Sequence, residues 1–491
     1  MESKKALIIG GGIAGLCTGV YLRRLGFDTE ILEMHTISGG LATAWERGGF
    51  TFENCIHWLV GSKEGGQLNA SWKEVFDIDR LEFFDDPVFQ VVERGAERIA
   101  IFRDPDRLEA ELLAKAPQDA ATIRELVRLI RRVAKLHMPE GDSFLRNLGA
   151  YLRFVPCFPM LSKHSKLTMA DYSRRFGSPT LRRFFAGGVG ELSLLAFVFA
   201  LAWMAQGNAG YPIGGSLRMI GLIEENYEKL GGRIRFKARV ERILVESGRA
   251  VGVKLQDGEE LRADVVVSAA DGHATIFEML EGRFVDQRIR RIYETYQPFP
   301  SYVQVSLGVD ADLRGEPGTV VLLLDQGIVV DPGKTEDVVT FRVFHFDPTF
   351  APPGQTAVVC PLTTYSHEYW CDLRENDRAR YDAEKERVAA EVGAVFERRF
   401  PQAKGKVRVV DVATPATIVR YTGNWKGSME GWLFTPATGI RQLPCVLPGL
   451  SGFYMVGQWI SPGGGLPAGL MTGRAVSKRI AKDTGFRWKL S

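Results

Sequence analysis

Apolar runs and helical periods alternate in three widely separated parts of this chain. The first part has an apolar run, a helical period and a second apolar run, at residues 6–9, 13–25 and 29–32. The second part has a helix followed by strands, at residues 233–236, 238–246, 250–255 and 264–268. The third part is a strand and a helix, at residues 452–457 and 470–482. Short apolar strands alternating with helices predict an α/β fold with a parallel sheet.

The two parts between these have other patterns. Residues 63–205 lose the α/β rhythm and carry helical periods at 106–116 and 119–137. Residues 286–415 predict a separate sheet-bearing domain, with a long charged helix and strands at residues 302–309, 319–324, 338–347, 356–362 and 407–413. A chain of 491 residues is too long for one core. We therefore divide it into five segments, 1–62, 63–205, 206–285, 286–415 and 416–491.

One segment is apolar enough to be compared with a membrane span. Residues 184–206 hold a single charge, Glu191, and residues 192–205 are uninterrupted and apolar or small. A span needs about 20 consecutive apolar residues, so the shorter clean run favours a buried helix. Glu191 either lines a substrate tunnel or caps that helix.

Two neighbouring stretches are basic. The helical period at 119–137 carries five basic residues beside an apolar stripe. Residues 143–170 include no acidic residue, and apolar side chains alternate there with Arg146, Arg153, Lys163 and Lys166. Apolar anchors with basic charges alone suit a surface that touches lipid headgroups. We expect a helical, membrane-facing region with peripheral contact at 143–170; the alternative for the first stretch is a solvated helix packed on its own domain.

Composition and charge bear on the partners, metal sites and cellular location that we expect for this protein. The net charge of +3 is small for this length, so nucleic acid is not an expected partner. The six cysteines are scattered without a Cys-x-x-Cys pair, which predicts reduced thiols and no metal site. The first strand begins by residue 6 and leaves no room for a signal or transit peptide, so we expect a cytoplasmic protein. The sequence does not indicate an oligomeric state.

The first strand leads directly into a glycine motif. Gly10-x-Gly12-x-x-Gly15 lies between a strand and a helix, and Glu33 follows the second strand. In this context Gly10 permits the tight turn, Gly12 the approach of a pyrophosphate, and Gly15 close packing of the helix. A carboxylate at position 33 accepts hydrogen bonds from ribose hydroxyls and disfavours a 2′-phosphate. The motif predicts an adenine dinucleotide, either NAD or FAD.

Glycines recur at two other places. Gly39 and Gly40 follow Glu33, and residues 461–469 form a tight glycine loop that opens the last helix. The N-terminus of that helix favours an electron-rich group such as the edge of a reduced flavin ring. A cofactor that reaches both ends of the chain is better explained as FAD than as NAD. We find one dinucleotide fingerprint, so a dedicated NAD(P)H site is not indicated.

These three motifs, in this order, resemble the phytoene desaturase, carotenoid isomerase and retinol saturase-like group of FAD-dependent amine-oxidase-type flavoproteins. The matching stretches are 10–15 with 33–40, 211–215 with 231–240 and 263–269, and 457–467. The resemblance covers the chain from end to end and is least specific in 63–205 and 286–415. It implies a Rossmann-type (GR2-like) FAD-binding domain built from three separated segments, beside an α+β substrate domain.

The resemblance also implies which residues hold FAD. The ADP half would lie against Gly10, Gly12, Ile13, Ala14, Gly15 and Glu33. The pyrophosphate and the ribityl chain would lie along Gly39, Gly40 and Leu41, with Gly457 at the pyrophosphate and the backbone of Val240 at the adenine. The isoalloxazine would lie by Gly464, Gly465, Leu466 and Pro467.

The sequence departs from the family pattern at two places near this site. Position 41, often basic, is Leu41. The stretch after the aromatic strand, which often reads as an aspartate and a glycine, is Glu53-Asn54-Cys55-Ile56-His57 here. His57 is ionisable near neutral pH and lies in a loop expected close to the flavin. It is our candidate catalytic acid or base; the alternative is a hydrogen-bonded structural histidine near the ribityl chain.

We therefore expect an FAD-dependent oxidoreductase that acts on C–C or C=C bonds of an apolar polyene or isoprenoid lipid, by hydride exchange with flavin N5. Desaturation, saturation and cis–trans isomerisation fit the same residues. Two alternatives stay open. One is a flavin amine oxidase, for which Trp425, Trp432 and Trp459 could form an aromatic cage, and the other is a flavin-bearing lipid carrier without turnover.

Overall fold

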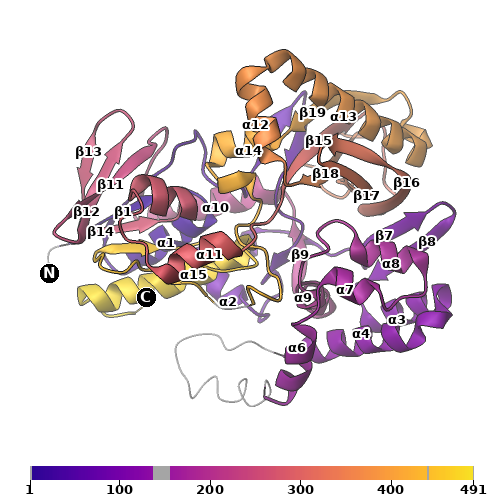
Figure 1. Cartoon of the computed structure of the whole chain (residues 1–491), viewed down its shortest axis with the longest axis horizontal. Coiled ribbons are helices and arrows are strands. Elements are labelled where there is room, and N and C mark those ends of the chain that lie inside the picture. Colours follow the sequence, from indigo (N-terminus) through magenta and orange to yellow (C-terminus); the bar gives the residue numbers. More distant parts are fainter. Residues whose placement is uncertain (1–2, 137–154, 440–441, 490–491) are drawn as a thin grey trace.

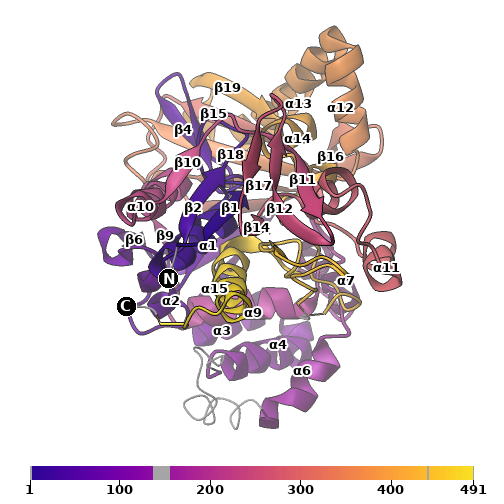
Figure 2. The same cartoon turned by 90° about the vertical axis from the view of Figure 1, so that its left-hand side faces the viewer.

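The computed structural model of the protein describes residues 3–136, 155–439 and 442–489. Figure 1 shows a region around a parallel sheet, a larger mixed sheet and a layer of helices. In both Figure 1 and Figure 2 the mixed sheet lies above the helical layer, and helices of that layer contact strands of the mixed sheet directly. Lys4 Nζ donates to the Thr484 carbonyl at 3.1 Å, so the two ends of the described chain lie side by side.

Five parallel strands form the first sheet, in the order β10, β2, β1, β14, β20. Strands β1 (Lys5–Ile9) and β2 (Asp28–Leu32) come from the start of the chain. Strands β10 (Arg233–Arg235) and β14 (Val265–Ser268) come from its middle, and β20 (Phe453–Met455) from its end. The expectation of a mixed α/β fold with a parallel sheet is confirmed.

One helix packs both on this sheet and on two further helices. Helix α1 (Ile13–Arg24) contacts both α10 (Gly215–Lys229) and α15 (Gly465–Thr484). A Cβ on Gly469 of α15 would lie 2.6 Å from Ile13 Cγ2 and 3.2 Å from the Ala14 nitrogen. The close crossing of α1 and α15 therefore requires glycine at position 469.

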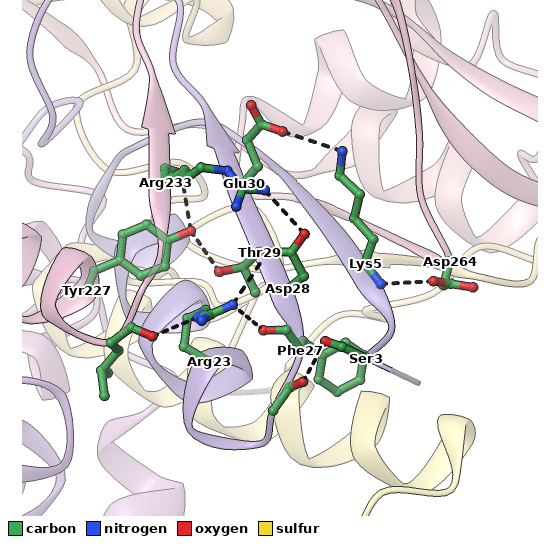
Figure 3. A network of polar contacts seen from close by, with 12 residues as sticks. Ser3, Lys5, Arg23, Phe27, Asp28, Thr29, Glu30, Tyr227, Arg233 and Asp264 are labelled. Atoms are coloured by element: carbon green, nitrogen blue, oxygen red, sulfur yellow. Dashed lines mark hydrogen bonds and ion pairs between the residues drawn. The ribbon is translucent and has the colours of Figure 1, made fainter. Parts of the chain in front are cut away.

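A network of polar contacts joins α1, β2 and β10 at the edge where the parallel strands begin (Figure 3). Arg23 donates to the Phe27 carbonyl at 2.8 Å and to the Leu230 carbonyl at 2.9 Å. Asp28 accepts a hydrogen bond from Arg233 at 3.2 Å. These contacts hold the helix–strand corners at the edge opposite the carboxyl ends of the strands.

The second sheet has seven strands, in the order β19, β15, β18, β17, β16, β7, β8. Their bounds are Val407–Ala413, Ser301–Val309, Thr356–Thr364, Lys334–Val343, Thr319–Asp331, Val88–Arg94 and Glu97–Phe102. Helices α12 (His367–Asn376) and α13 (Arg378–Arg399) lie over it. Strands β7 and β8 come from 63–205, where the sequence predicted helices; β7 joins the sheet by parallel pairing with β16, a strand far along the chain.

Within the described residues, the helical layer includes α3 (Pro105–Lys115), α4 (Ala120–Val133), α6 (Phe158–His164), α7 (Met169–Ser173), α8 (Pro179–Ala186) and α9 (Leu194–Ala205). Helix α9 packs on α4 and buries Leu194, Val198 and Leu201, as the sequence predicted for this apolar segment. In the described ranges, no helix is long and apolar enough to cross a membrane. Residues 143–154 of the acid-free stretch lie outside the described residues.

Ion pairs neutralise part of the basic face of α4. Arg131 lies 2.7 Å from a carboxylate oxygen of Glu109 on α3, and Arg124 lies 4.0 Å from the other. Lys163 of α6 pairs with Glu125 of α4 at 3.3 Å. These contacts favour the alternative of a solvated helix packed on its own domain for this stretch.

Smaller elements connect the three parts. Three small sheets are β3 (Ala44–Arg47) with β4 (Phe50–Glu53); β5 (Leu59–Val60) with β9 (Ala209–Pro212) and β6 (Phe83–Phe84); and the meander β11 (Val240–Glu246), β12 (Arg249–Leu255) and β13 (Glu260–Arg262). The connecting helices are α2 (Asn69–Val75), α11 (Gln287–Thr295) and α14 (Pro415–Thr422). The short helical turns are η1 (Ile78–Arg80), η2 (Pro117–Asp119), η3 (Val155–Cys157), η4 (Ala274–Met279), η5 (Pro401–Ala403) and η6 (Trp425–Gly427). The turn η4 is a π-helix that begins shortly after β14. Because π-helical turns are frequent at functional sites, η4 indicates a functional site near the carboxyl end of β14.

The crossing of α1 and α15 gives a stability prediction. We expect Gly469→Ala to lower the free energy of unfolding by about 1–3 kcal/mol, because the added methyl group forces the two helices apart. Gly221→Ala on α10 is the matched control, since a Cβ there meets no atom within 4 Å. This control should be neutral or stabilising by up to about 1 kcal/mol. Urea unfolding of the cofactor-free protein measures both; equal effects of the two substitutions would contradict the prediction.

Candidate functional site

A cavity of about 810 Å³ lies where the strands of the parallel sheet end. Its walls come from the turn after β1, the ends of β2 and β14, the start of β11, the turn after β20 and the start of α15. The segment that follows α14 closes another side. Ligands of open α/β sheets bind at the carboxyl ends of the strands, so this is the edge where a ligand is expected.

The turn between β1 and α1 brings backbone to the cavity wall, which Gly10, Gly12, Ile13 and Ala14 line. Gly15 lies within α1, where an added Cβ would collide with the Gly10 carbonyl oxygen, so glycine alone permits this packing of helix on turn. Among the described residues no side chain caps the N-terminus of α1. Its backbone N–H groups are therefore available for an anionic ligand.

Glu33 follows β2 on the cavity wall and ties two loops together. Its carboxylate accepts hydrogen bonds from the N–H groups of Gly11 and His35, each at 2.7 Å. The Glu33 carbonyl accepts from the Ala238 N–H at 2.9 Å, which holds the start of β11, with Val240, at the same wall. Each carboxylate oxygen has two lone pairs, so Glu33 can still accept a hydrogen bond from a hydroxyl group of a ligand.

The paired glycines lie against the first turn. Gly39 N–H donates to the Gly11 carbonyl at 2.9 Å. Gly39, Gly40 and Leu41 all line the cavity. The cavity wall therefore includes the backbone of two loops, this one and the glycine turn after β1.

The last part of the chain supplies a further section of the cavity wall. Gly457, Gly465 and Leu466 line the cavity. Gly457 N–H donates to Thr472 Oγ1 of α15 at 2.9 Å, so the turn after β20 is fixed to that helix. The start of α15 therefore points a second helix N-terminus at the cavity.

Four of the predicted site residues are not part of the described cavity wall: Gly15, Gly464, Pro467 and His57. Gly15 lies in α1, and Gly464 and Pro467 lie at the start of α15; neighbouring residues of both helices line the cavity. All the other predicted binding residues meet at this one cavity, although they come from distant parts of the sequence. Their contacts with a cofactor stay predictions.

The loop that carries Cys55 and His57 is organised by the buried carboxylate of Glu53. Glu53 accepts hydrogen bonds from the backbone N–H groups of residues 54, 55 and 56 and from the N–H and hydroxyl of Ser216 in the first turn of α10. Burial raises the pKa of Glu53, and this effect is larger than the opposite effect of the hydrogen bonds, which lower it. Cys55 lines the cavity, and burial, followed by the charges of Glu53 and Glu430, raises the pKa of its thiol.

His57 meets Arg342 of β17. The guanidinium donates from Nη1 to His57 Nδ1, and from Nη2 to the His57 carbonyl at 3.3 Å. By its accessible surface His57 is exposed, but many protein atoms lie near the ring. This burial among protein atoms, and then the charge of Arg342, lowers the pKa of His57 below its ordinary value. The imidazole is therefore neutral near neutral pH, with Nδ1 occupied as an acceptor. Burial also lowers the pKa of Arg342, to about 10.

Several residues on the wall were not predicted from the sequence. Asp271, just after β14, accepts from the N–H groups of Ala274 and Trp425, each at 2.8 Å, and burial raises its pKa to about 7. Its place three residues beyond a central parallel strand could have identified it. Glu430 also lines the cavity, and no local motif marks it.

Basic side chains line the wall as well. They are Arg239, Arg374, Arg420 and Lys426. Lys426 adopts a left-handed backbone conformation, with φ 57°, which is rare for a residue with a side chain. Position 41 lacks the basic residue that often follows the paired glycines, so these side chains are the positive charges that the cavity offers to an anionic ligand.

The three tryptophans considered as an aromatic cage lie together, but they do not face the cavity equally. Trp432 packs edge-on against Trp459 at 5.1 Å and is fully buried, whereas Trp425 and Trp459 reach the wall. Trp432 Nε1 donates to the Trp459 carbonyl at 3.1 Å. Trp432 therefore supports the other two from behind.

Known proteins resemble this chain along nearly its whole length. Residues 13–481 match the family described as flavin containing amine oxidoreductase. Prolycopene isomerase 2 of an Oncidium hybrid cultivar is 26% identical over 99% of this chain and 85% of its own. The neurosporene-forming phytoene desaturase of Rhodobacter capsulatus is 24% identical over 97% of this chain and 94% of its own. Cyclohexylamine oxidase from Brevibacterium oxydans has the same fold, with a TM-score of 0.60 at 16% identity, over 97% of this chain and 99% of that chain.

The chain belongs to the flavin-containing amine oxidoreductase family. It is an FAD-dependent oxidoreductase. The cavity suits FAD, because glycine turns at two helix N-termini and basic side chains line the same space. When bound, the flavin supplies the two-electron chemistry, and the protein supplies binding, orientation and exclusion of water.

Glu33 gives a cofactor-binding prediction. We expect Glu33→Ala to raise the dissociation constant for FAD about ten- to a hundredfold, because it removes an acceptor for the ribose and two bonds that order the glycine turn. Glu30→Ala, on β2, is the matched control, since Glu30 pairs with Lys5 at 3.6 Å and is not on the described cavity wall. Titration of the cofactor-free protein with FAD measures both. Unchanged affinity in Glu33→Ala would contradict a ribose role.

Proposed function

We propose that this protein exchanges hydride between FAD and carbon–carbon bonds of an apolar polyene or isoprenoid lipid, by desaturation, saturation or cis–trans isomerisation. The observation that carries the proposal is similarity along nearly the whole chain to an isomerase and a desaturase that are named for prolycopene and phytoene. That similarity spans the mixed sheet and the helical layer as well as the glycine motifs.

We assign FAD to the cavity, with a binding domain made of 1–62, 206–285 and 416–491. The parallel sheet takes all its strands from these three segments. In this assignment the ADP half lies at the glycine turn and Glu33, and the isoalloxazine lies near Gly465 and Leu466. The basic residues Arg374, Arg420 and Lys426 then offset the pyrophosphate charge in place of a basic residue at position 41.

Aromatic side chains beyond the cavity support an apolar substrate. Three residues after Cys55, Trp58 packs edge-on against Phe89 at 5.5 Å. On α9, Phe197 and Trp203 are only half-buried and belong to the same apolar cluster as Trp58 and Phe89. Half-buried apolar side chains of this kind suit the path of an apolar molecule.

The amine oxidase alternative has less support. It rests on solved structures that share the fold at low identity, and on an aromatic cage. Of the three tryptophans, the fully buried Trp432 is not on the described cavity wall. The other alternative, a lipid carrier without turnover, would leave the flavin without a chemical role, although the matched family is one of oxidoreductases.

Anaerobic flavin spectroscopy tests the function. We expect a polyene or isoprenoid either to bleach the oxidised flavin, as a desaturase substrate does, or to be converted by enzyme whose flavin has been reduced. A matched panel of primary amines should leave the flavin oxidised. Reduction by amines, with no conversion of any polyene, would favour the amine oxidase; purified protein that takes up no FAD would remove the whole proposal.

We also propose that the protein touches membranes at the helical layer, where an apolar substrate resides. Support comes from η3 and α6, where Val155 and Phe158 are each 67% exposed. Two lysines lie close to them in the sequence: Lys166, and Lys163, whose ammonium also pairs with Glu125. Exposed apolar anchors beside positive charge favour an anionic lipid surface.

Vesicle flotation tests this contact. We expect the double substitution Val155→Ser and Phe158→Ser to reduce flotation with anionic vesicles severalfold, because it removes two apolar anchors. Val410→Ser is the matched control, since Val410 is 53% exposed on β19, in the mixed sheet. Flotation that is equal for all three proteins would discredit this surface as the anchor.

A further inference from the structure

Glu430 is a carboxyl group that the cavity contains and the assigned FAD contacts do not use. It lies after η6 on the segment that crosses the start of α15. Its Oε1 lies 3.7 Å from the place that a Cβ on Gly465 would occupy. The side chain is therefore on the cavity wall beside the N-terminus of α15, the end that we assign to the isoalloxazine.

Glu430 makes no hydrogen bond or ion pair with another described residue, although protein surrounds it. Burial is the one cause that shifts its pKa, which it raises to about 7. A carboxyl group in this state is present in both protonation forms near neutral pH, as a group that exchanges protons must be.

The other ionisable groups near this end of the cavity are already engaged. Cys55, on the facing loop, keeps its proton because its pKa is raised, and Glu53 behind it is held by Ser216 and the loop backbone. Asp271 is held by the N–H groups of Ala274 and Trp425. The first turn of α15 has no acidic residue, and Lys426 projects over the Trp425 ring at 4.5 Å. His57 is neutral and bonded to Arg342.

We propose that Glu430 is the catalytic acid or base that exchanges a proton with the substrate carbon next to the one that exchanges hydride. This inference rests on the proposed function. In a desaturation, one C–H bond breaks and its electron pair leaves as hydride to FAD. The neighbouring C–H bond breaks and its electron pair becomes the new C=C bond, while its proton bonds to the Glu430 carboxylate. In a saturation both transfers run in reverse, and the Glu430 carboxylic acid gives the proton.

Glu430→Gln tests the proposal, because it keeps the size of the side chain and removes the exchangeable proton. We expect FAD content to stay unchanged and turnover of the polyene, or of its reduced product, to fall about 10²- to 10⁴-fold. In the wild type, the rate should have an inflection near pH 7, rising with pH for desaturation and falling for saturation. Glu430→Asp should keep the inflection at a reduced rate. Glu336→Gln, a buried carboxyl of the mixed sheet, is the matched control and should keep the wild-type rate.

A second measurement does not depend on turnover. The pKa of Glu430 is higher in the fold than in the unfolded chain, so its contribution to stability is complete below the unfolded value of 4.5 and is lost as pH rises through about 7. The stability of Glu430→Gln relative to wild type should therefore increase with pH across this window and level off above it. Asp271 titrates in the same window in both proteins, so its effect cancels in the difference.

The outcomes separate the two proposals. A wild-type rate and inflection in Glu430→Gln would overturn the role of Glu430 and leave the proposed function intact. If no polyene reacts with the wild-type enzyme, the proposed function fails, and the role of Glu430 fails with it. Identical stability profiles of the two proteins would also overturn the role of Glu430, whatever the substrate.

Discussion

Parallel pairing of β1 with β14 is the contact on which the site depends. It sets Ile9 beside Ser268, so the glycine turn and the Asp271 loop begin at the same edge of the sheet. Strands β2 and β20 extend the sheet on either side and add Glu33 and Gly457 to that edge. Parallel neighbours need long crossover connections, and here the crossovers hold the mixed sheet and the helical layer. The cofactor site and the regions assigned to the substrate thus follow from one topology.

The glycine turn, Glu33 and the buried helix α9 could be predicted from the sequence because their patterns are local. A strand, a turn, a helix and a second strand follow one another within residues 5–33, and each glycine has a task that neighbouring residues reveal. The family resemblance then connected this unit with the loop before α15. The cavity wall accordingly includes most of the residues expected there.

Other parts of the site depend on contacts between residues that are far apart in the sequence, and the local periodicity of the sequence does not predict such contacts. Arg342 contacts His57 from β17, which belongs to a sheet whose strands come from two segments, 63–205 and 286–415. Glu430 reaches the cavity because its loop crosses α15, and the loop itself has neither helical nor strand periodicity. The same reason explains β7 and β8, whose place is set by pairing with β16.

The position of β20 also affects how the protein is made. Strand β14 pairs with β1 on one side and with β20 on the other, and β20 lies near the end of the chain. A ribosome adds roughly 5–20 residues per second, so one edge of β14 waits on the order of ten seconds or more for its partner. Such an open edge invites pairing with another nascent chain. In the assignment proposed above, FAD can be enclosed only after β20 and the start of α15 have been synthesised, so a shortage of flavin would act on a chain that already includes the other walls of the cavity.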